Sequence, residues 1–100
     1  MSYSLEIRSD ALSDIAEAAT WYDEREPGLG LEFVRTIREA IGNLPATPFA
    51  HRLRNRRRNV RWFLPSRFPY RIVYRVHGEH FTIIAVLHSA RHDRHWKERT

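Results

Sequence analysis

Apolar and polar residues follow two different periods in the first part of the chain. Residues 2–8 alternate between apolar and polar, which predicts a short, half-buried strand. The next stretch has apolar residues every three or four positions, as in an amphipathic helix. Ser9 or Asp10 can cap the first N–H groups of this helix, and Pro27-Gly28 should end it. Its expected apolar stripe consists of Leu12, Ile15, Ala19 and Tyr22, with Ala16 beside it.

A second helix is expected from Leu29 to about Asn43. Pro45 and Pro48 should end it, because proline lacks an N–H and disfavours helix in the residue before it. The short connection between the two helices predicts an antiparallel pair. Residues 45–58 are then expected to form a loop. The apolar stripe of this second helix consists of Phe33, Ile37, Ala40, Ile41 and Leu44.

Three more strands are expected in the second half of the chain. They cover residues 59–64, 68–76 and 80–88, and the last two are joined by a tight turn at His77-Gly78-Glu79. The order of elements is therefore β-α-α-β-β-β, without an internal repeat or boundary. We interpret residues 1–100 as a single α+β domain, with a helical hairpin packed on one face of a mainly antiparallel four-stranded sheet.

The alternation in these strands also predicts which side chains meet the helices. The fully apolar sets should be buried, because burying unpaired arginines would cost several kcal/mol, to order of magnitude, for each ion. These sets are Val60, Trp62 and Leu64; Tyr70, Ile72, Tyr74 and Val76; and Phe81, Ile83, Ala85 and Leu87.

The opposite face of the sheet, which we call the mixed face, is expected to combine cations with apolar side chains. Exposed apolar surface rimmed by charge often marks a contact site. The alternative is that the C-terminal tail folds over this face as a lid, anchored by Trp96. Both interpretations stay open at the level of the sequence. The expected members of the mixed face are Arg61, Arg71, Arg75 and His88 with Phe63, Val73, Ile84 and Val86.

The charge of the chain is divided unevenly along its length. The net charge is +5, yet residues 1–50 carry four arginines against nine acids, and residues 51–100 carry thirteen Lys and Arg against three acids. Such asymmetry indicates a polyanion or an acidic protein as partner. There is no cysteine, no apolar run long enough for a membrane span and no apolar signal core at the N-terminus. We therefore expect a cytoplasmic protein without disulfides, thiolate metal sites or membrane insertion.

Six arginines fall within residues 52–61, directly before Trp62 and Phe63. Arginine donates two hydrogen bonds at once to phosphate, and aromatic rings stack on bases, so this stretch is a candidate for binding nucleic acid. A solvated basic loop that binds an acidic protein is the alternative. The predicted residues for binding a partner or nucleic acid are Arg54, Arg56, Arg57, Arg58, Arg61, Phe63, Arg71, Val73, Arg75, His88 and Arg91.

Acid–base chemistry on RNA is a second hypothesis. Metal-free RNA cleavage needs a base, an acid and cations near the transition-state charge, and histidine suits either proton-transfer role. His88, Arg91 and His92, with Arg61 and Arg71 on neighbouring strands, could supply these groups. A zinc site at His88, His92 and His95 is disfavoured because the predicted strand breaks their helical spacing. We expect neither a metal nor a cofactor.

Several stretches resemble the RelE/ParE toxin superfamily of bacterial toxin–antitoxin modules. In the first helix the residues Ala11, Asp14, Ile15, Ala18, Trp21 and Tyr22 carry the resemblance, followed by Phe33 in the second helix. The segments FPYRIVYRV and IIAVLHSARHDRHWKER are the more specific part, and the likeness covers nearly the whole chain. The chain looks closest to the ParE-like, plasmid-stabilisation branch.

The resemblance implies a toxin that a cognate antitoxin wraps and holds inactive. ParE-like members poison DNA gyrase and are not known to catalyse a reaction, whereas RelE-like members cut mRNA on the ribosome. If the chain were such a nuclease, Arg61, Arg71, His88 and Arg91 would stand at the catalytic positions. The chain has a single lysine and no tyrosine after Arg91, which favours the ParE-like hypothesis. A structural relative without toxic activity is a further alternative.

Overall fold

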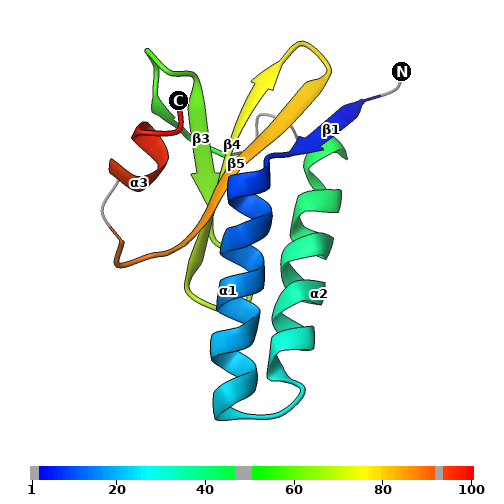
Figure 1. Cartoon of the computed structure of the whole chain (residues 1–100). Helices are drawn as coiled ribbons and strands as arrows, with labels where there is room; N and C mark the ends of the chain where they lie inside the picture. Colours follow the sequence, from blue (N-terminus) through cyan, green and yellow to red (C-terminus); the bar gives the residue numbers. More distant parts are fainter. Residues whose placement is uncertain (1–2, 47–50, 92–93) are drawn as a thin grey trace.

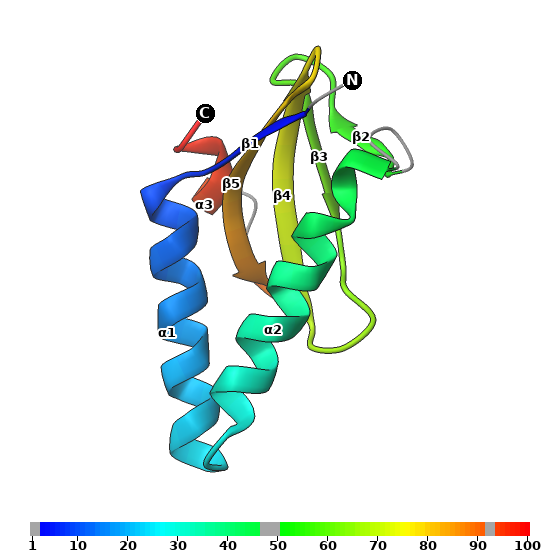
Figure 2. The ribbon, with the colours of Figure 1, turned by 90° about the vertical axis from the view of Figure 1, so that its right-hand side faces the viewer.

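The computed structural model describes residues 3–46, 51–91 and 94–100. Two long helices lie side by side against one face of a twisted sheet, and a short C-terminal helix lies against the other face (Figures 1 and 2). The elements in chain order are β1 (Ser4–Ile7), α1 (Ser9–Arg25), α2 (Leu29–Gly42), the 3-10 turn η1 (Leu44–Ala46), β2 (Leu53–Asn55), β3 (Val60–Phe63), β4 (Tyr70–His77), β5 (His80–His88) and α3 (Arg94–Lys97).

The sheet has five strands in the order β1-β5-β4-β3-β2. β1 runs parallel to β5, and every other neighbouring pair is antiparallel. The predicted α+β class and helical hairpin are therefore confirmed, but the sheet has one strand more than expected. The extra strand, β2, lies inside the segment predicted as a loop. It has three residues and pairs irregularly with β3, so it leaves no alternating pattern in the sequence.

The buried stripe of helix α1 agrees with the prediction only in part: Ile15 is buried and Ala19 and Tyr22 pack against the core, as expected. Its buried residues are Ala11, Ile15 and Ala18, whereas Leu12 is 53% exposed and Ala16 is also exposed. Two of its three buried residues are therefore alanines. In α2 the prediction is confirmed, since Phe33, Ile37, Ile41 and Leu44 are buried and Ala40 is partly buried.

The connection between α1 and α2 depends on two glycines and one carboxylate. Gly28 adopts a φ of 90°, in the left-handed region that disfavours other residues. Asp23 Oδ1 accepts hydrogen bonds from the N–H groups of Gly28 at 3.1 Å and Gly30 at 2.8 Å. A Cβ atom on Gly30 would lie 2.4 Å from the carbonyl oxygen of Ala19, so the two helices touch backbone to backbone here.

A bulge in β5 reverses the predicted faces of its second half. Val73 pairs with Ala85 while Tyr74 pairs with Ile83, so Ile84 is an extra residue in β5. Beyond Ile84, successive side chains therefore point to the faces opposite to those predicted. Phe81 and Ile83 pack in the core beneath the helices as expected, and so does Val86 in place of Ala85 and Leu87.

In β3 the alternation was also predicted one residue out of phase, so its residues point to the faces opposite to those expected. Arg61 pairs with Tyr74, Trp62 with Val73 and Phe63 with Ile72. Because directly paired residues share a face, Arg61 and Phe63 lie on the helix side of the sheet and Trp62 on the mixed face. Leu64, predicted to be buried, follows the strand and is 48% exposed. In β4 the prediction is confirmed: Ile72, Tyr74 and Val76 belong to the helix-side core, and Tyr70 packs against it.

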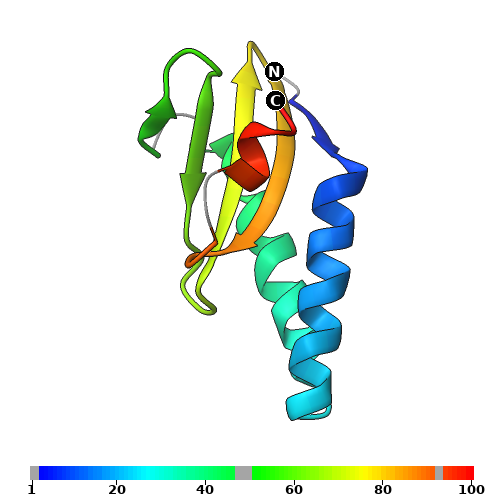
Figure 3. The ribbon, with the colours of Figure 1, turned by 60° about the vertical axis from the view of Figure 1, so that its left-hand side comes forward.

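The second face of the sheet has a core of its own, covered by the C-terminal segment. Trp96 of α3 is 2% exposed and packs with apolar residues of β3, β4 and β5. Figure 3 shows α3 lying in front of β4 and β5, with α2 behind the sheet. The lid interpretation is thus confirmed for the described part of the tail. The apolar residues in this second core are Val60, Val73, Ile84, Ala85, Leu87 and Trp96, with Trp62 partly buried beside them.

Candidate functional site

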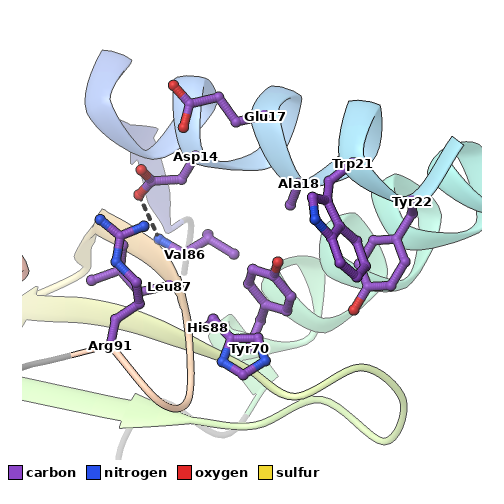
Figure 4. A pocket seen from close by; sticks show the side chains of 10 residues that line it. All are labelled: Asp14, Glu17, Ala18, Trp21, Tyr22, Tyr70, Val86, Leu87, His88 and Arg91. Atoms are coloured by element: carbon purple, nitrogen blue, oxygen red, sulfur yellow. Dashed lines mark hydrogen bonds between the residues drawn. The ribbon is translucent and has the colours of Figure 1, made fainter. Parts of the chain in front are cut away.

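A cavity that contains two predicted site residues, His88 and Arg91, lies between α1 and the end of β5 (Figure 4). Its volume is about 350 Å³, and it is open to solvent on one side. We call it the α1–β5 pocket. Its lining residues are Asp14, Glu17, Ala18, Trp21 and Tyr22 from α1, Tyr70 from β4, Val86, Leu87 and His88 from β5, and Arg91.

The pocket exists because β1 is too short to cover all of β5. β1 ends at Ile7, opposite Ile83, so in the described part of the chain no strand pairs with this side of β5 beyond that point. Side chains form hydrogen bonds with the backbone groups of this edge of β5 instead. Asp14 Oδ2 accepts a hydrogen bond from the Val86 N–H at 2.9 Å. Arg99 Nη1 donates to the carbonyl oxygen of Ile84 at 3.2 Å.

Asp14, which lines the pocket, also forms an ion pair with Arg99. Arg99 Nη1 lies 2.7 Å from Asp14 Oδ2, and Nη2 lies 3.1 Å from Oδ1. The pKa of Arg99 is raised, chiefly by this hydrogen bond with Asp14. Arg8 Nη1 donates to the backbone oxygen of Arg99 at 2.7 Å. We call the Asp14–Arg99 pair the latch, because it ties the C-terminal segment to α1.

The floor of the pocket is aromatic. The rings of Tyr70 and His88 meet edge to face with centroids 5.3 Å apart, and Tyr22 lies 6.2 Å from Tyr70. Burial raises the pKa of Tyr70; the neighbouring Tyr22 raises it further, while Arg91 lowers it. Both tyrosine hydroxyls therefore stay protonated at neutral pH. Trp21 forms a wall that is 47% exposed, with the Arg25 guanidinium 3.5 Å from its ring centroid.

Charges of both signs rim this aromatic floor. Asp14 and Glu17 lie on the α1 side, and Arg91 lies on the β5 side (Figure 4). A purely cationic rim would suit a polyanion, whereas a mixed rim around an aromatic floor suits a peptide with apolar anchors. The pocket is thus better fitted to a protein segment than to nucleic acid.

Arginines gather on the other face of the sheet. The Arg54 guanidinium lies 3.9 Å from the ring centroid of Trp62, and that of Arg71 lies 5.2 Å from it. Arg71 is 6% exposed and donates from Nη2 to the backbone oxygen of Arg91. Arg75 Nε donates to the backbone oxygen of Arg58 at 3.0 Å. Arg71 and Arg75 therefore hold neighbouring backbone in place, and Arg54 is the exposed cation of this group.

The structure does not bring the four residues of the nuclease hypothesis together. His88 and Arg91 share the α1–β5 pocket, but Arg71 lies on the opposite face of the sheet. Arg61 lies on the helix side near the β3 edge, where Nη1 donates to the His51 backbone oxygen at 2.7 Å.

Four residues assigned to the mixed face are thus corrected. They lie on the helix side of the sheet, because the alternation of β3 was predicted one residue out of phase and β5 contains a bulge. These residues are Arg61, Phe63, His88 and Val86. Phe63 stacks on His51 with centroids 4.1 Å apart. Arg71, Val73, Arg75 and Ile84 do lie on the mixed face, although Val73 is fully buried beneath the lid.

Two further observations concern metals and membranes. In the described residues, no three His, Cys, Asp or Glu side chains gather as a metal site requires. His92, part of the acid–base and zinc hypotheses, lies outside those residues, and His95 contacts Arg91 at 3.3 Å. No helix in the described part of the chain has the length and apolarity that a membrane crossing needs.

The sequence did not single out Asp14, Glu17 or Trp21 as site residues. A signal was nevertheless present. Asp14, Ala18 and Trp21 are spaced by four and three positions, so Asp14 and Trp21 share one face of α1 with the buried Ala18. That this face borders an open strand edge depends on where β1 ends, which is a tertiary feature.

Comparison with known proteins identifies the class to which this fold belongs. Residues 5–93 match the family described as ParE toxin of type II toxin-antitoxin system, parDE. The chain therefore belongs to the ParE toxin family, and the resemblance stated from the sequence is confirmed.

A solved structure of the chromosomal ParDE TA system from P. aeruginosa contains a similar chain. The two chains are 25% identical and superpose with a TM-score of 0.75, over 86% of this chain and 95% of that one. A search of curated protein sequences found no match.

Proposed function

We propose that this toxin-family protein acts by inhibiting DNA gyrase and is neutralised by a cognate antitoxin in the bacterial cytoplasm. Membership of the ParE family supports the gyrase target, since ParE-like toxins poison gyrase. The likeness to a chain of a ParDE system supports an antitoxin partner.

One structural observation favours an inhibitor over a ribonuclease. A metal-free ribonuclease needs its base, acid and cations within reach of one phosphodiester. Here Arg61 and Arg71 lie on opposite faces of the sheet, and only His88 and Arg91 share a cavity. The basic side chains are thus arranged for binding and for holding the fold, rather than around one reacting atom.

The α1–β5 pocket is our candidate for the antitoxin contact. It offers an aromatic floor, charges of both signs and a partly exposed tryptophan wall, and buried aromatic anchors carry much of the affinity in protein interfaces. We therefore expect an extended antitoxin segment to insert an apolar side chain beside Trp21 and Tyr70.

The antitoxin contact is tested with the product of the adjacent reading frame. Trp21→Ala should weaken its binding by about 2 kcal/mol, or roughly thirtyfold, because tryptophan is a frequent anchor. Leu31→Ala is the matched control, since Leu31 is 54% exposed on α2 and does not line the pocket. Equal affinities of the two variants, measured by calorimetry, would remove the pocket from the proposal.

The gyrase target is tested with purified proteins. The toxin should block supercoiling of relaxed plasmid by gyrase with ATP, and prior addition of antitoxin should restore it. A parallel translating extract should keep its mRNA intact. Cleaved mRNA together with normal supercoiling would replace gyrase inhibition by the RelE-like alternative.

A further inference from the structure

A short arginine-rich hairpin projects from the sheet at the edge opposite β1. It consists of residues 52–58, which form β2 and the turn into β3, and we call it the arginine hairpin. Arg52, Arg54, Arg56 and Arg57 are all exposed in it. Among the described residues, none of these four forms an ion pair with a carboxylate.

Several arginines elsewhere in the fold do form ion pairs with carboxylates. Arg67 lies 3.1 Å from Glu32, Arg25 lies 3.9 Å from Glu24, and Arg99 is bound to Asp14. The hairpin thus concentrates positive charge that its described surroundings leave uncompensated. A patch of one sign attracts a partner of the opposite sign and accelerates its association.

The backbone of the hairpin is fixed by side chains. Asn55 Oδ1 accepts from the Arg58 N–H at 2.9 Å, and Asn59, at a φ of 55°, donates from Nδ2 to the Val76 oxygen at 2.8 Å. Arg75 Nε donates to the Arg58 oxygen at 3.0 Å. The exposed guanidinium groups therefore project from an ordered turn, which lowers the entropy cost of binding.

The chemistry of the hairpin favours phosphates on a duplex over unpaired bases. Proteins that bind single strands present exposed aromatic rings on which bases stack. Here Trp62 is only partly exposed, with the Arg54 guanidinium 3.9 Å from its ring centroid. Exposed arginines without a stacking platform suit the phosphate backbone, which proteins contact without reading the sequence.

We propose that the arginine hairpin binds the phosphate backbone of duplex DNA, without sequence preference. The consequence for gyrase rests on the function proposed above: the hairpin would hold the toxin against the DNA segment that gyrase engages. This surface is separate from the α1–β5 pocket, because none of the hairpin residues lines that pocket.

The test measures binding of the full chain to a short fluorescent duplex, in the absence of gyrase. Arg56→Gln/Arg57→Gln is the test variant, and Arg35→Gln/Arg38→Gln on α2 is the control that removes the same charge from exposed positions elsewhere. With about four phosphate contacts, the slope of log affinity against log salt should be near −3.6, and the test variant should flatten it by about 1.8. The test variant should bind at least about tenfold more weakly at low salt, and the control should stay within about twofold.

Three results would overturn the proposal. The first is equal loss in both double variants, which would show a net-charge effect without a site. The second is equal or tighter binding of an unpaired strand of the same length. The third is polyglutamate displacing the duplex at equal charge concentration, which would indicate an acidic protein as partner.

The gyrase assay separates this inference from the proposed function. If the wild-type chain binds duplex DNA but leaves supercoiling unchanged, gyrase inhibition fails and the DNA surface stands. If it blocks supercoiling without binding free duplex, the DNA surface fails alone. When both hold, Arg56→Gln/Arg57→Gln should require about tenfold more toxin for the same block, in line with its loss of DNA affinity.

Discussion

The latch between Asp14 and Arg99 gives a quantitative test of how the C-terminal segment is held. The Asp14 side chain is 11% exposed and the Arg99 side chain 21% exposed, with two short N–H···O contacts between them. Removing one partner of a fully buried pair costs about 3–5 kcal/mol, and an exposed pair is worth about 0–1 kcal/mol. For this intermediate burial we expect Arg99→Met to lower the free energy of unfolding by about 2 kcal/mol.

Removal of Asp14 should cost more than removal of Arg99. Asp14→Ala leaves Arg99 without this partner and also deprives the Val86 N–H of its acceptor. An unsatisfied backbone donor costs about 1–3 kcal/mol, at the lower end where water can reach it, so we expect a total loss of about 3 kcal/mol.

Urea unfolding of the two single variants and the double variant isolates the pair. The coupling energy of this cycle should be about 1.5–2 kcal/mol. Asp10→Asn is the matched control, because Asp10 is 54% exposed and lies 3.9 Å from the same arginine; it should change stability by less than about 0.5 kcal/mol. A coupling energy below about 0.5 kcal/mol, or equal effects of Asp10→Asn and Asp14→Ala, would refute the reasoning.

Two further predictions concern the helical hairpin and the β3 edge. Gly30→Ala should destabilise the fold by about 2 kcal/mol or more, because its Cβ would meet the Ala19 oxygen at 2.4 Å. Gly42→Ala is the control, since a Cβ there would have nothing within 4 Å and should shift the urea midpoint little. Equal shifts of the midpoint in the two variants would contradict the close helix contact. Burial, reinforced by Arg61, lowers the pKa of His51, so the unfolded chain binds its proton more readily and stability should fall as the pH drops below about 6.5. His51→Gln should flatten this dependence of the urea midpoint between about pH 7.5 and 5, and an unchanged dependence would argue against the lowered pKa.

The strands show which parts of such a fold can be predicted from sequence. In β4 the alternation is sufficient, because Arg71 and Arg75 mark one face clearly. In β5 residues 83–87 are all apolar and buried, since helices cover one face and Trp96 the other. With both faces buried, nothing in the sequence marks the bulge at Ile84. The face to which each residue after Ile84 points could therefore not be predicted.

The candidate site was only partly predictable for a related reason. His88 and Arg91 were predicted to be site residues at the end of a strand. Their placement beside Tyr70 follows from the bulge, which the sequence did not reveal. Asp14 has the spacing of a surface residue on a helix. It accepts a hydrogen bond from the β5 backbone only because β1 ends early and leaves that edge of β5 unpaired. The cluster of arginines was evident from composition alone, whereas its segment was predicted as a loop, and the ordered turn of the hairpin depends on contacts from β4.

Gyrase as the target is tested most directly by trapping its cleaved DNA. Gyrase, plasmid, ATP and the purified chain are incubated together, then denatured and treated with protease, and linear plasmid is quantified on a gel. If the chain poisons gyrase, linear, protein-linked DNA accumulates with toxin concentration and disappears when the antitoxin is added first. Plasmid that stays intact and is supercoiled at the normal rate, at toxin in large excess over gyrase, would contradict gyrase inhibition.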